Sequence, residues 1–517
     1  MRVSRRNLLS ILALLSMAAV GVAAPDSKLA DAVQSGDASA VRSLLKLHVD
    51  VNVPQIDGMT ALAWAAHNDD LETADLLIRA GANAKTASRY GISPLTEAAT
   101  NANPAMIELL LKAGADPNTA LPEGDTALML AARTGKVEAV KALLDHGAQV
   151  NAKEGWHGET ALIWAAGENH PEVIRLLLAH GADPNSQATH LLYPEMKAAP
   201  AQVLSKLPKG GLTALMTAAR EGSFESAQVL LKAGADPNKR DPNNMSALLI
   251  AISNAHYDVA NVLIQNGADL NDGSLAVAVD VRDAEVLRAA TNHADELSAM
   301  DIIKALIAKG AKPDSVLSDP IPAKKALGGA PNAPMDAPAF YRAAKFGDLE
   351  VMRLLLDKGA DATHALKDGS TPLMVASGLG AKPAQAVDYE KQVSEEDMIT
   401  AVKLCLYHGA DINAADGTGM TALHGAALKG ADKVVQYLAD QGAKLDAKDK
   451  RDRTPFDVAR GVAAGPPGAG GGVSRNPTVH ASTAALLRKL MGLPADYVPP
   501  EPTKLSQLKP QEENKGE

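Results

Sequence analysis

The chain has one cysteine and few aromatic residues. Because Cys405 has no second cysteine to pair with, a disulfide within the chain is excluded, and stability must come from packing. Aromatic residues make up 3% of the 517 residues, whereas 46% are hydrophobic, mostly Ala, Leu and Val. This composition favours thin layers packed through small side chains over one large aromatic core.

Basic side chains are also fewer than acidic ones. The 51 basic and 61 acidic side chains give a formal net charge of −10. A negative net charge argues against nucleic acid or an anionic membrane surface as a partner.

The sequence also lacks the motifs of common catalytic and metal sites. HExxH, CxxC, GxSxG and Walker patterns are absent, so we predict no catalytic residue, no cofactor and no metal. Cys405 and His408 lie one helical turn apart, as the two members of a thiolate pair would. However, Cys405 falls on the apolar face of its predicted helix, and His408 repeats the place of His146 and His180. A structural role is therefore predicted for both.

The stretch Glu123–Asn151 shows the unit from which the chain is built. Thr126 is suited to cap a short first helix, and Gly135 breaks that helix. Apolar residues at helical spacing then predict a second helix, which Gly147 ends in a left-handed conformation. Neither helix can bury its apolar face alone, so the unit needs copies on both sides.

These copies are present along most of the chain. From His48 to Gly181 the residue that ends the second helix recurs every 33 or 34 residues. Counting this residue along the whole chain gives about 12 repeats. The ending residues are His48, Gly81, Gly114, Gly147, Gly181, Gly234, Gly267, Gly310, Gly359, Gly409, Gly442 and Gly492. The predicted capping residues are Ser27, Thr60, Ser93, Thr126, Thr160, Thr213, Ser246, Thr371, Thr421 and Thr454. The cap fails at Gly273 and Pro338, which stand at the same place in two further copies.

A 33-residue period that combines Thr-Ala-Leu, a following Ala-Ala pair and Gly-Ala-Asp-x-Asn resembles the ankyrin repeat. The resemblance covers Ser27 to Asp496, although the family's full Thr-Pro-Leu-His form is absent and Thr421–His424 comes nearest to it. It implies an all-α fold, an ankyrin-repeat α-solenoid of helix-turn-helix units with hairpin loops projecting from one side. It also implies binding to other proteins without chemistry, and a structural role for His424.

The N-terminal segment, residues 1–24, is predicted to be a signal peptide of a bacterial exported protein. Arg2, Arg5 and Arg6 precede an uncharged apolar run over residues 8–22, which is too short for a membrane span. Ser4–Leu9 resembles a twin-arginine signal, with Ser10 where lysine is common, and an ordinary secretory signal is an equal alternative. Either signal predicts a periplasmic or secreted protein with no membrane span in the mature chain.

The remaining features are insertions into the array, which is predicted to occupy residues 25–496. They lie near residues 186–209, 283–298, 313–337, 381–397 and 461–478. The last contains Gly-Pro-Pro-Gly-Ala-Gly-Gly-Gly, which is typical of a flexible linker. Residues 497–517 are rich in Pro, Glu and Lys and are predicted to be disordered.

The repeat geometry implied by the resemblance places three residues of each copy on the concave side, namely the one before the cap and the two after the Ala-Ala pair. These candidate partner-binding residues are Met59, His67, Asn68, Asp125, Arg133, Thr134, Glu159, Gly167, Glu168, Leu212, Arg220, Glu221, Met245, Ser253 and Asn254. The alternative for Met59, Leu212 and Met245 is packing on the neighbouring hairpin.

A second group of candidates lies at hairpin loops. Trp156 and His157 stand between glycines in a hairpin with one extra residue, and Tyr193 lies in the next insertion. Trp156 and the insertion form either one exposed binding patch or a small core in which the insertion covers Trp156.

Two functions remain open. The favoured one is an exported, non-catalytic scaffold, expected to be a monomer, that binds an envelope or secreted protein. The alternative is an enzyme or small-ligand-binding protein with its site in the inserted loops.

Overall fold

The computed structural model describes residues 27–190, 210–288, 295–318, 334–380, 393–461 and 479–494, together with Tyr497. The predicted signal peptide, most of the insertions and the C-terminal tail lie outside the described residues. The chain divides into two compact units, residues 1–188 and 189–517. Each unit is described by itself.

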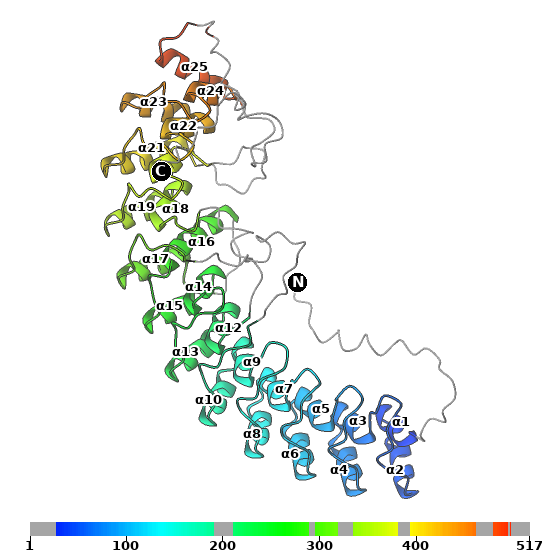
Figure 1. Cartoon of the computed structure of the whole chain (residues 1–517). Coiled ribbons are helices and arrows are strands. Elements are labelled where there is room, and N and C mark those ends of the chain that lie inside the picture. Colours follow the sequence, from blue (N-terminus) through cyan, green and yellow to red (C-terminus); the bar gives the residue numbers. More distant parts are fainter. Residues whose placement is uncertain are drawn as a thin grey trace, which may run out of the picture. The chain divides into compact units, whose positions relative to one another are not determined.

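Unit 1 is a stack of helix pairs (Figure 1). In each pair the first helix is an inner helix and the second an outer helix. The pairs are α1 (Lys28–Gln34) with α2 (Ala38–Lys46), α3 (Ala61–His67) with α4 (Leu71–Arg79), α5 (Pro94–Asn101) with α6 (Pro104–Lys112), α7 (Ala127–Thr134) with α8 (Val137–Asp145), and α9 (Ala161–Gly167) with α10 (Pro171–Ala179).

Unit 2 repeats the arrangement. Its pairs are α12 (Ala214–Glu221) with α13 (Phe224–Lys232), α14 (Ala247–Ser253) with α15 (Tyr257–Gln265), α16 (Ser274–Arg288) with α17 (Ala299–Ala308), α18 (Ala339–Phe346) with α19 (Leu349–Leu356), α20 (Pro372–Ala376) with α21 (Glu395–Tyr407), α22 (Ala422–Lys429) with α23 (Asp432–Asp440), and α24 (Pro455–Ala459) with α25 (Ala481–Leu490). The predicted all-α fold of helix pairs is confirmed.

Within each unit, helices stack in two layers. Inner helices contact the next inner helices, as α3 contacts α5 and α5 contacts α7, while outer helices such as α6 and α8 form the second layer. The Ala-Ala pairs lie in the inner helices, and both alanines are fully buried in α3, α7 and α9. Small side chains therefore allow the inner helices to approach closely, as the composition predicted.

Local sequence signals set the helix ends. Most predicted capping residues accept a hydrogen bond from a backbone N–H of the first turn, namely Thr60, Ser93, Thr126, Thr160, Thr213, Ser246, Thr371 and Thr454. Ser27 is an exception, because its hydroxyl donates to the Asp31 carboxylate at 3.1 Å instead. Every predicted helix-ending residue has positive φ, including His48 at 54°.

The asparagine at the last place of the Gly-Ala-Asp-x-Asn motif, and of its variants such as Gly-Ala-Gln-Val-Asn at 147–151, joins consecutive repeats. The Asn151 side chain accepts from the backbone N–H of Asp183 at 2.9 Å and donates to the carbonyl of Gly181 at 2.9 Å. Asn52, Asn118 and Asn238 make the same pair of bonds to their next repeats. These two hydrogen bonds explain why asparagine recurs at the last place of the motif.

One predicted insertion starts differently. α16 continues to Arg288, so the first residues of the 283–298 insertion extend a helix instead of forming a loop. No glycine or proline interrupts the segment after Ser274, so nothing in the local sequence ends the helix earlier. Within the described parts of the chain, no helix is long and apolar enough to cross a membrane.

Candidate protein-binding surface

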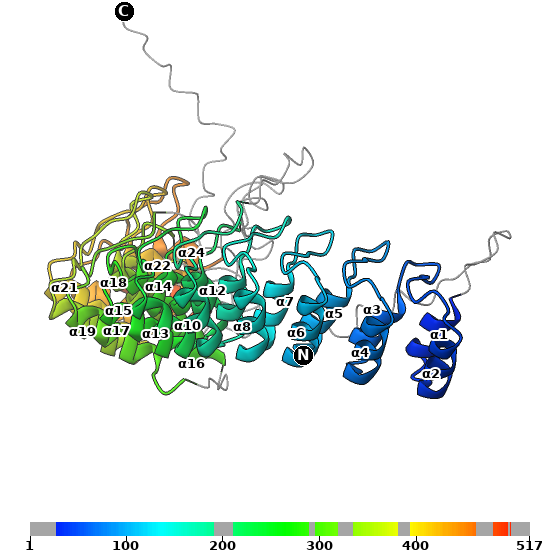
Figure 2. The same ribbon diagram turned by 90° about the horizontal axis from the view of Figure 1, so that it is seen from below.

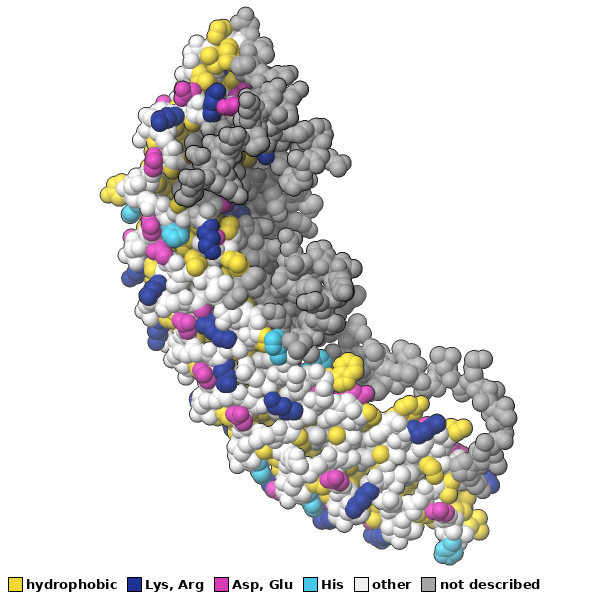
Figure 3. Space-filling model, viewed as in Figure 1, with side chains coloured by type: hydrophobic (Ala, Val, Ile, Leu, Met, Phe, Trp, Pro, Cys, Tyr) yellow, Lys and Arg dark blue, Asp and Glu magenta, His cyan; other side chains and the backbone are white. Residues whose placement is uncertain are grey.

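The hairpin loops between repeats project to one side of the helices (Figure 2). In unit 1, three of these loops carry a large apolar side chain that is mostly exposed. Ile56 is 80% exposed, Tyr90 63% and Trp156 69%. We call these three residues the hairpin-tip row. Figure 3 shows hydrophobic groups along the edge of unit 1 from which the loops project. Large apolar side chains exposed at loops can mark binding sites.

The buried carboxylate of Glu154 holds Trp156 at its tip. This carboxylate accepts hydrogen bonds from the backbone N–H groups of Trp156 at 2.6 Å, His157 at 2.6 Å and Glu159 at 3.0 Å. In a regular hairpin an aspartate accepts these hydrogen bonds. Asp416, for example, accepts from the backbone N–H groups of Thr418 and Met420. The hairpin of Glu154 is one residue longer, and glutamate, with one more methylene, spans the longer turn.

Neighbouring hairpins are tied to one another by backbone hydrogen bonds. The N–H of Arg89 donates to the carbonyl of Asp57 at 3.0 Å, and the N–H of Gly155 donates to the carbonyl of Glu123 at 2.7 Å. Gly124 permits the second contact, because a Cβ there would lie 2.6 Å from the Gly155 nitrogen. The tips are therefore held in place before any partner arrives.

Acidic groups surround the tip of Trp156. Glu123 is exposed beside it, and the half-buried Asp125 lies close to both Glu123 and Glu154. Burial, followed by the nearby charges of Glu154 and Glu123, raises the pKa of Asp125 above its ordinary value. Apart from burial, the charges of Glu123 and Glu154 contribute to this rise, and these carboxylates place negative charge at this end of the row, which favours cationic groups.

Two predicted contact residues are not available to a partner. Met59 is 5% exposed and Met245 is 3% exposed, so the prediction that they contact a partner is wrong. Their carbonyls accept from the N–H of Gln55 and of Asp241, which closes each hairpin over the stack. The residue before the cap is thereby turned inward, as the alternative of packing on the neighbouring hairpin required.

Other predicted residues of unit 1 are exposed but engaged within their own unit. His67 Nδ1 lies 3.0 Å from Glu97 Oε2, and the Asn68 amide donates to the Val33 carbonyl at 2.8 Å. The Arg133 guanidinium stacks 5.2 Å from the centre of the Trp164 ring. Each of these contacts joins an inner helix to that of a neighbouring repeat, so these residues link consecutive repeats.

The remaining candidates are placed as follows. The Thr134 hydroxyl donates to the Ala131 carbonyl at 2.7 Å, and His157 is exposed beside Trp156. In unit 2, Leu212 is partly exposed and Arg220 pairs with Glu221 at 2.8 Å. Tyr193, and with it the insertion that either extends the Trp156 patch or covers it, lies outside the described residues.

Sequence reasoning missed Ile56 and Tyr90. The available signal was like the one that singled out Trp156, a large apolar residue within two positions of a glycine at a hairpin tip. Ile56 precedes Asp57-Gly58, and Tyr90 precedes Gly91. This signal, applied to every hairpin, includes Ile56 and Tyr90, although it also includes the buried Met59 beside Gly58.

The thiol of the single cysteine has low reactivity. Cys405 is fully buried, and burial raises the pKa of its thiol to about 12. At neutral pH the nucleophilic thiolate is therefore scarcely populated. In the part of the chain that the structure describes, no group of three or more His, Cys, Asp or Glu side chains is arranged to hold a metal ion.

Two curated relatives are similar to part of the chain. The B-cell lymphoma 3 protein homolog of Mus musculus is 32% identical over 123 residues, which are 24% of this chain and 24% of that protein. The Drosophila melanogaster protein "Ankyrin repeat and KH domain-containing protein mask" is 35% identical over 112 residues, or 21% of this chain and 2% of that protein. The chain thus spans about a quarter or less of each relative's length.

Among solved structures, the human ASB11 ankyrin repeat domain is 22% identical, with a TM-score of 0.39, and the match covers 47% of this chain and 99% of that chain. The family model "Ankyrin repeats (3 copies)" matches residues 29–120, 115–188, 189–274 and 391–460, which together exceed half of the sequence. The chain therefore belongs to the ankyrin repeat family.

Proposed function

We propose that this chain is an exported, non-catalytic scaffold, acting as a monomer, that binds an envelope or secreted protein through the hairpin-tip row. The observation that carries the proposal is the exposure of Ile56, Tyr90 and Trp156 at hairpin loops of one unit. Ankyrin repeats generally mediate protein–protein interactions, and solenoids of this kind offer extended binding surfaces.

The row has the properties of an interface centre. Trp and Tyr are among the residues that most often carry binding energy, because each covers a large area with few rotatable bonds. The hydrogen bonds from Trp156 to Glu154 and from Gly155 to Glu123 hold the tip in advance. Pre-organisation of this kind lowers the entropic cost of association.

The charges beside the row indicate the chemistry of the partner. Glu123 and Asp125 flank Trp156 with negative charge, and the aromatic face of Trp156 also attracts cations. The partner surface is therefore an apolar segment with a lysine or arginine next to it.

Export is the second half of the proposal and rests on the basic start and apolar run of residues 1–24. The test is fractionation of cells that make the full chain. The mature protein is expected beyond the cytoplasmic membrane. If the twin-arginine pathway is used, changing Arg5 and Arg6 to lysine stops export. Continued export of this double variant shows a general secretory signal, and a cytoplasmic wild-type chain contradicts export altogether.

The interaction is tested by placing a photo-crosslinking amino acid at position 156 and, as a control, at position 407. Tyr407 is 86% exposed at the end of the outer helix α21, in the other unit. A specific crosslink from position 156 but not from position 407 identifies the partner. Trp156→Ala is then expected to weaken that complex by about 2 kcal/mol with an unchanged unfolding midpoint. Affinity kept by Trp156→Ala would place the interface elsewhere.

A further inference from the structure

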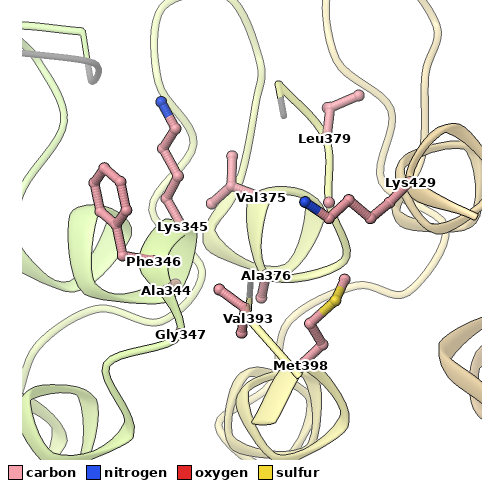
Figure 4. Close-up of a pocket in the computed structure, with 11 residues that line it drawn as sticks. Ala344, Lys345, Phe346, Gly347, Val375, Ala376, Leu379, Val393, Met398 and Lys429 are labelled. Atoms are coloured by element: carbon pink, nitrogen blue, oxygen red, sulfur yellow. The ribbon is translucent and has the colours of Figure 1, made fainter. Parts of the chain in front are cut away.

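The cavity beside α20 in unit 2 is too small to hold a ligand. Figure 4 shows the residues that line it, among them Val375, Val393 and Met398. The space between them is about 40 Å³, which is room for a few water molecules, whereas small-molecule sites in proteins enclose about 300–1,000 Å³. The exposed hairpin-tip row of unit 1 is therefore the better candidate for recognising another molecule.

The hairpins that precede α3, α5, α7 and α9 lie side by side along unit 1 (Figure 2). The first touches the second, because a Cβ at Gly58 would lie 2.9 Å from the Arg89 nitrogen. The second touches the third, because a Cβ at Gly91 would lie 2.6 Å from the Pro122 Cδ. The N–H of Gly155, in the fourth, donates to the third at 2.7 Å. Since each hairpin belongs to one repeat and packed helices lie about 8–10 Å apart, the tips follow one another at intervals of about 10 Å.

The four tips present a fixed order of chemistry. The first carries the exposed Ile56, and the second carries the exposed Tyr90 with the exposed Arg89 next to it. The third carries the exposed acidic Glu123. The fourth carries Trp156. The apolar anchors therefore stand one and then two repeats apart, with a negative charge between the last two anchors.

This spacing matches one face of an α-helix. Seven residues of an α-helix rise about 10.5 Å and bring the side chain back to nearly the same face. In an extended strand about 10 Å corresponds to three residues, and side chains three residues apart point to opposite faces. A polyproline helix does return to one face after three residues, but it docks in grooves lined by aromatic residues. Tyr90 and Trp156 stand two hairpins apart and form no such groove.

On the basis of the function proposed above, we infer that the hairpin-tip row binds an amphipathic α-helix of the partner protein. The apolar side chains of this helix lie at positions i, i+7 and i+21, opposite Ile56, Tyr90 and Trp156. A lysine or arginine at i+14 meets Glu123, and an acidic residue beside i+7 meets Arg89. Because the anchors are unevenly spaced, only one register places every group opposite its counterpart.

The probe for this helix is a synthetic peptide with leucine at i, i+7 and i+21, glutamate at i+8 and arginine at i+14 in a background of alanine and glutamine. Its matched control has the same composition, with the middle leucine moved to i+9, on the opposite side of the helix. Fluorescence anisotropy with the full mature chain is expected to show about tenfold weaker binding of the control, because one anchor is lost. Trp156→Ala is expected to weaken binding of the probe by a similar factor with an unchanged unfolding midpoint.

Charge reversal tests the register. Glu123→Lys is expected to weaken binding of the arginine probe about tenfold, and a probe with glutamate at i+14 is expected to regain binding to this variant. Glu138→Lys, at an exposed residue of the outer helix α8, is the control and is expected to bind the arginine probe like the wild type. An equal loss in both variants would mean that only net charge matters, which overturns the register.

The outcomes separate the bound conformation from the proposed function. Equal binding of the probe and its control, or tighter binding of a proline-rich peptide with leucine at every third residue, overturns the helix. If Trp156→Ala still weakens those complexes, the hairpin-tip row remains the binding surface. If no peptide binding depends on Trp156, the helix is overturned, and the crosslink from position 156 decides the proposed function separately.

Discussion

The Trp156 backbone N–H donates to the Glu154 carboxylate at 2.6 Å, so a buried acid holds an exposed aromatic residue. The same carboxylate receives the N–H groups of His157 and Glu159. The tip of this hairpin is therefore built around one side chain, and the exposure of Trp156 depends on it.

Replacing Glu154 by alanine is expected to destabilise unit 1 by about 2 kcal/mol, because three backbone N–H groups lose a charged acceptor. Glu154→Asp is expected to recover little, since the shorter side chain cannot span the longer turn. Glu154→Gln keeps one acceptor oxygen and is expected to lie between alanine and the wild type. Chemical denaturation measures the order. A Glu154→Asp variant as stable as the wild type would contradict the role assigned to the extra methylene.

Alanine substitutions at two glycines with the same backbone conformation are expected to lower the free energy of unfolding by different amounts. Gly147 has φ of 91°, and a Cβ added there would meet nothing within 4 Å, so Gly147→Ala costs only the backbone strain, about 1 kcal/mol. Gly124 has φ of 95°, and a Cβ there would meet the Gly155 nitrogen at 2.6 Å. Gly124→Ala is therefore expected to cost more and to speed amide exchange at Gly155. Equal costs in chemical denaturation would contradict the close contact between the hairpins.

The stability of unit 2 is expected to fall as the pH is lowered below about 6.5, the ordinary pKa of histidine. Burial lowers the pKa of His424 in the folded state. Its Nδ1 accepts from the Thr421 N–H at 3.1 Å, and its Nε2 lies 3.1 Å from the Arg453 carbonyl, an arrangement that suits the neutral ring. Because the unfolded state then binds the proton more readily than the folded state, the stabilisation is complete above pH 6.5 and is lost below it.

The control for this pH dependence is the exposed His408 of the same unit. His424→Gln is expected to flatten the decline in unfolding free energy between about pH 7 and pH 5, and His408→Gln is expected to leave it unchanged. The same decline in His424→Gln as in the wild type would assign it to other groups.

The Arg342 guanidinium is fully buried and pairs with the buried Asp280 carboxylate of α16. Arg342 also donates to the carbonyls of Ala337 and Pro334, both at 2.8 Å. Arg342→Met is expected to cost about 3–5 kcal/mol, because Asp280 is left as an unpaired buried charge.

The double variant Asp280→Leu with Arg342→Met removes both charges and is expected to recover much of this loss. Burial already raises the pKa of Asp280, so lowering the pH should also restore part of the stability of Arg342→Met as the carboxyl becomes neutral. Denaturation of the single and double variants as a function of pH measures both effects. A double variant no more stable than Arg342→Met would mean that the guanidinium acts through its carbonyl contacts alone.

The sequence by itself determined the repeating architecture. The period, the capping hydroxyls and the left-handed helix ends are local signals, each encoded within a few residues. That is why even His48 could be assigned a positive φ without a structure. The Gly-Ala-Asp-x-Asn motif was visible as well, although its bonds from Asn151 to Gly181 and Asp183 were not.

Only the tertiary structure decided which side chains face solvent and where space remains. Met59 and Ile56 stand three residues apart in one hairpin, yet one is buried and the other exposed, because the neighbouring repeats cover one and leave the other uncovered. The Arg342–Asp280 pair likewise depends on a contact between residues tens of positions apart. A local pattern specifies the conformation of its own segment, whereas burial and cavities follow from how successive repeats meet.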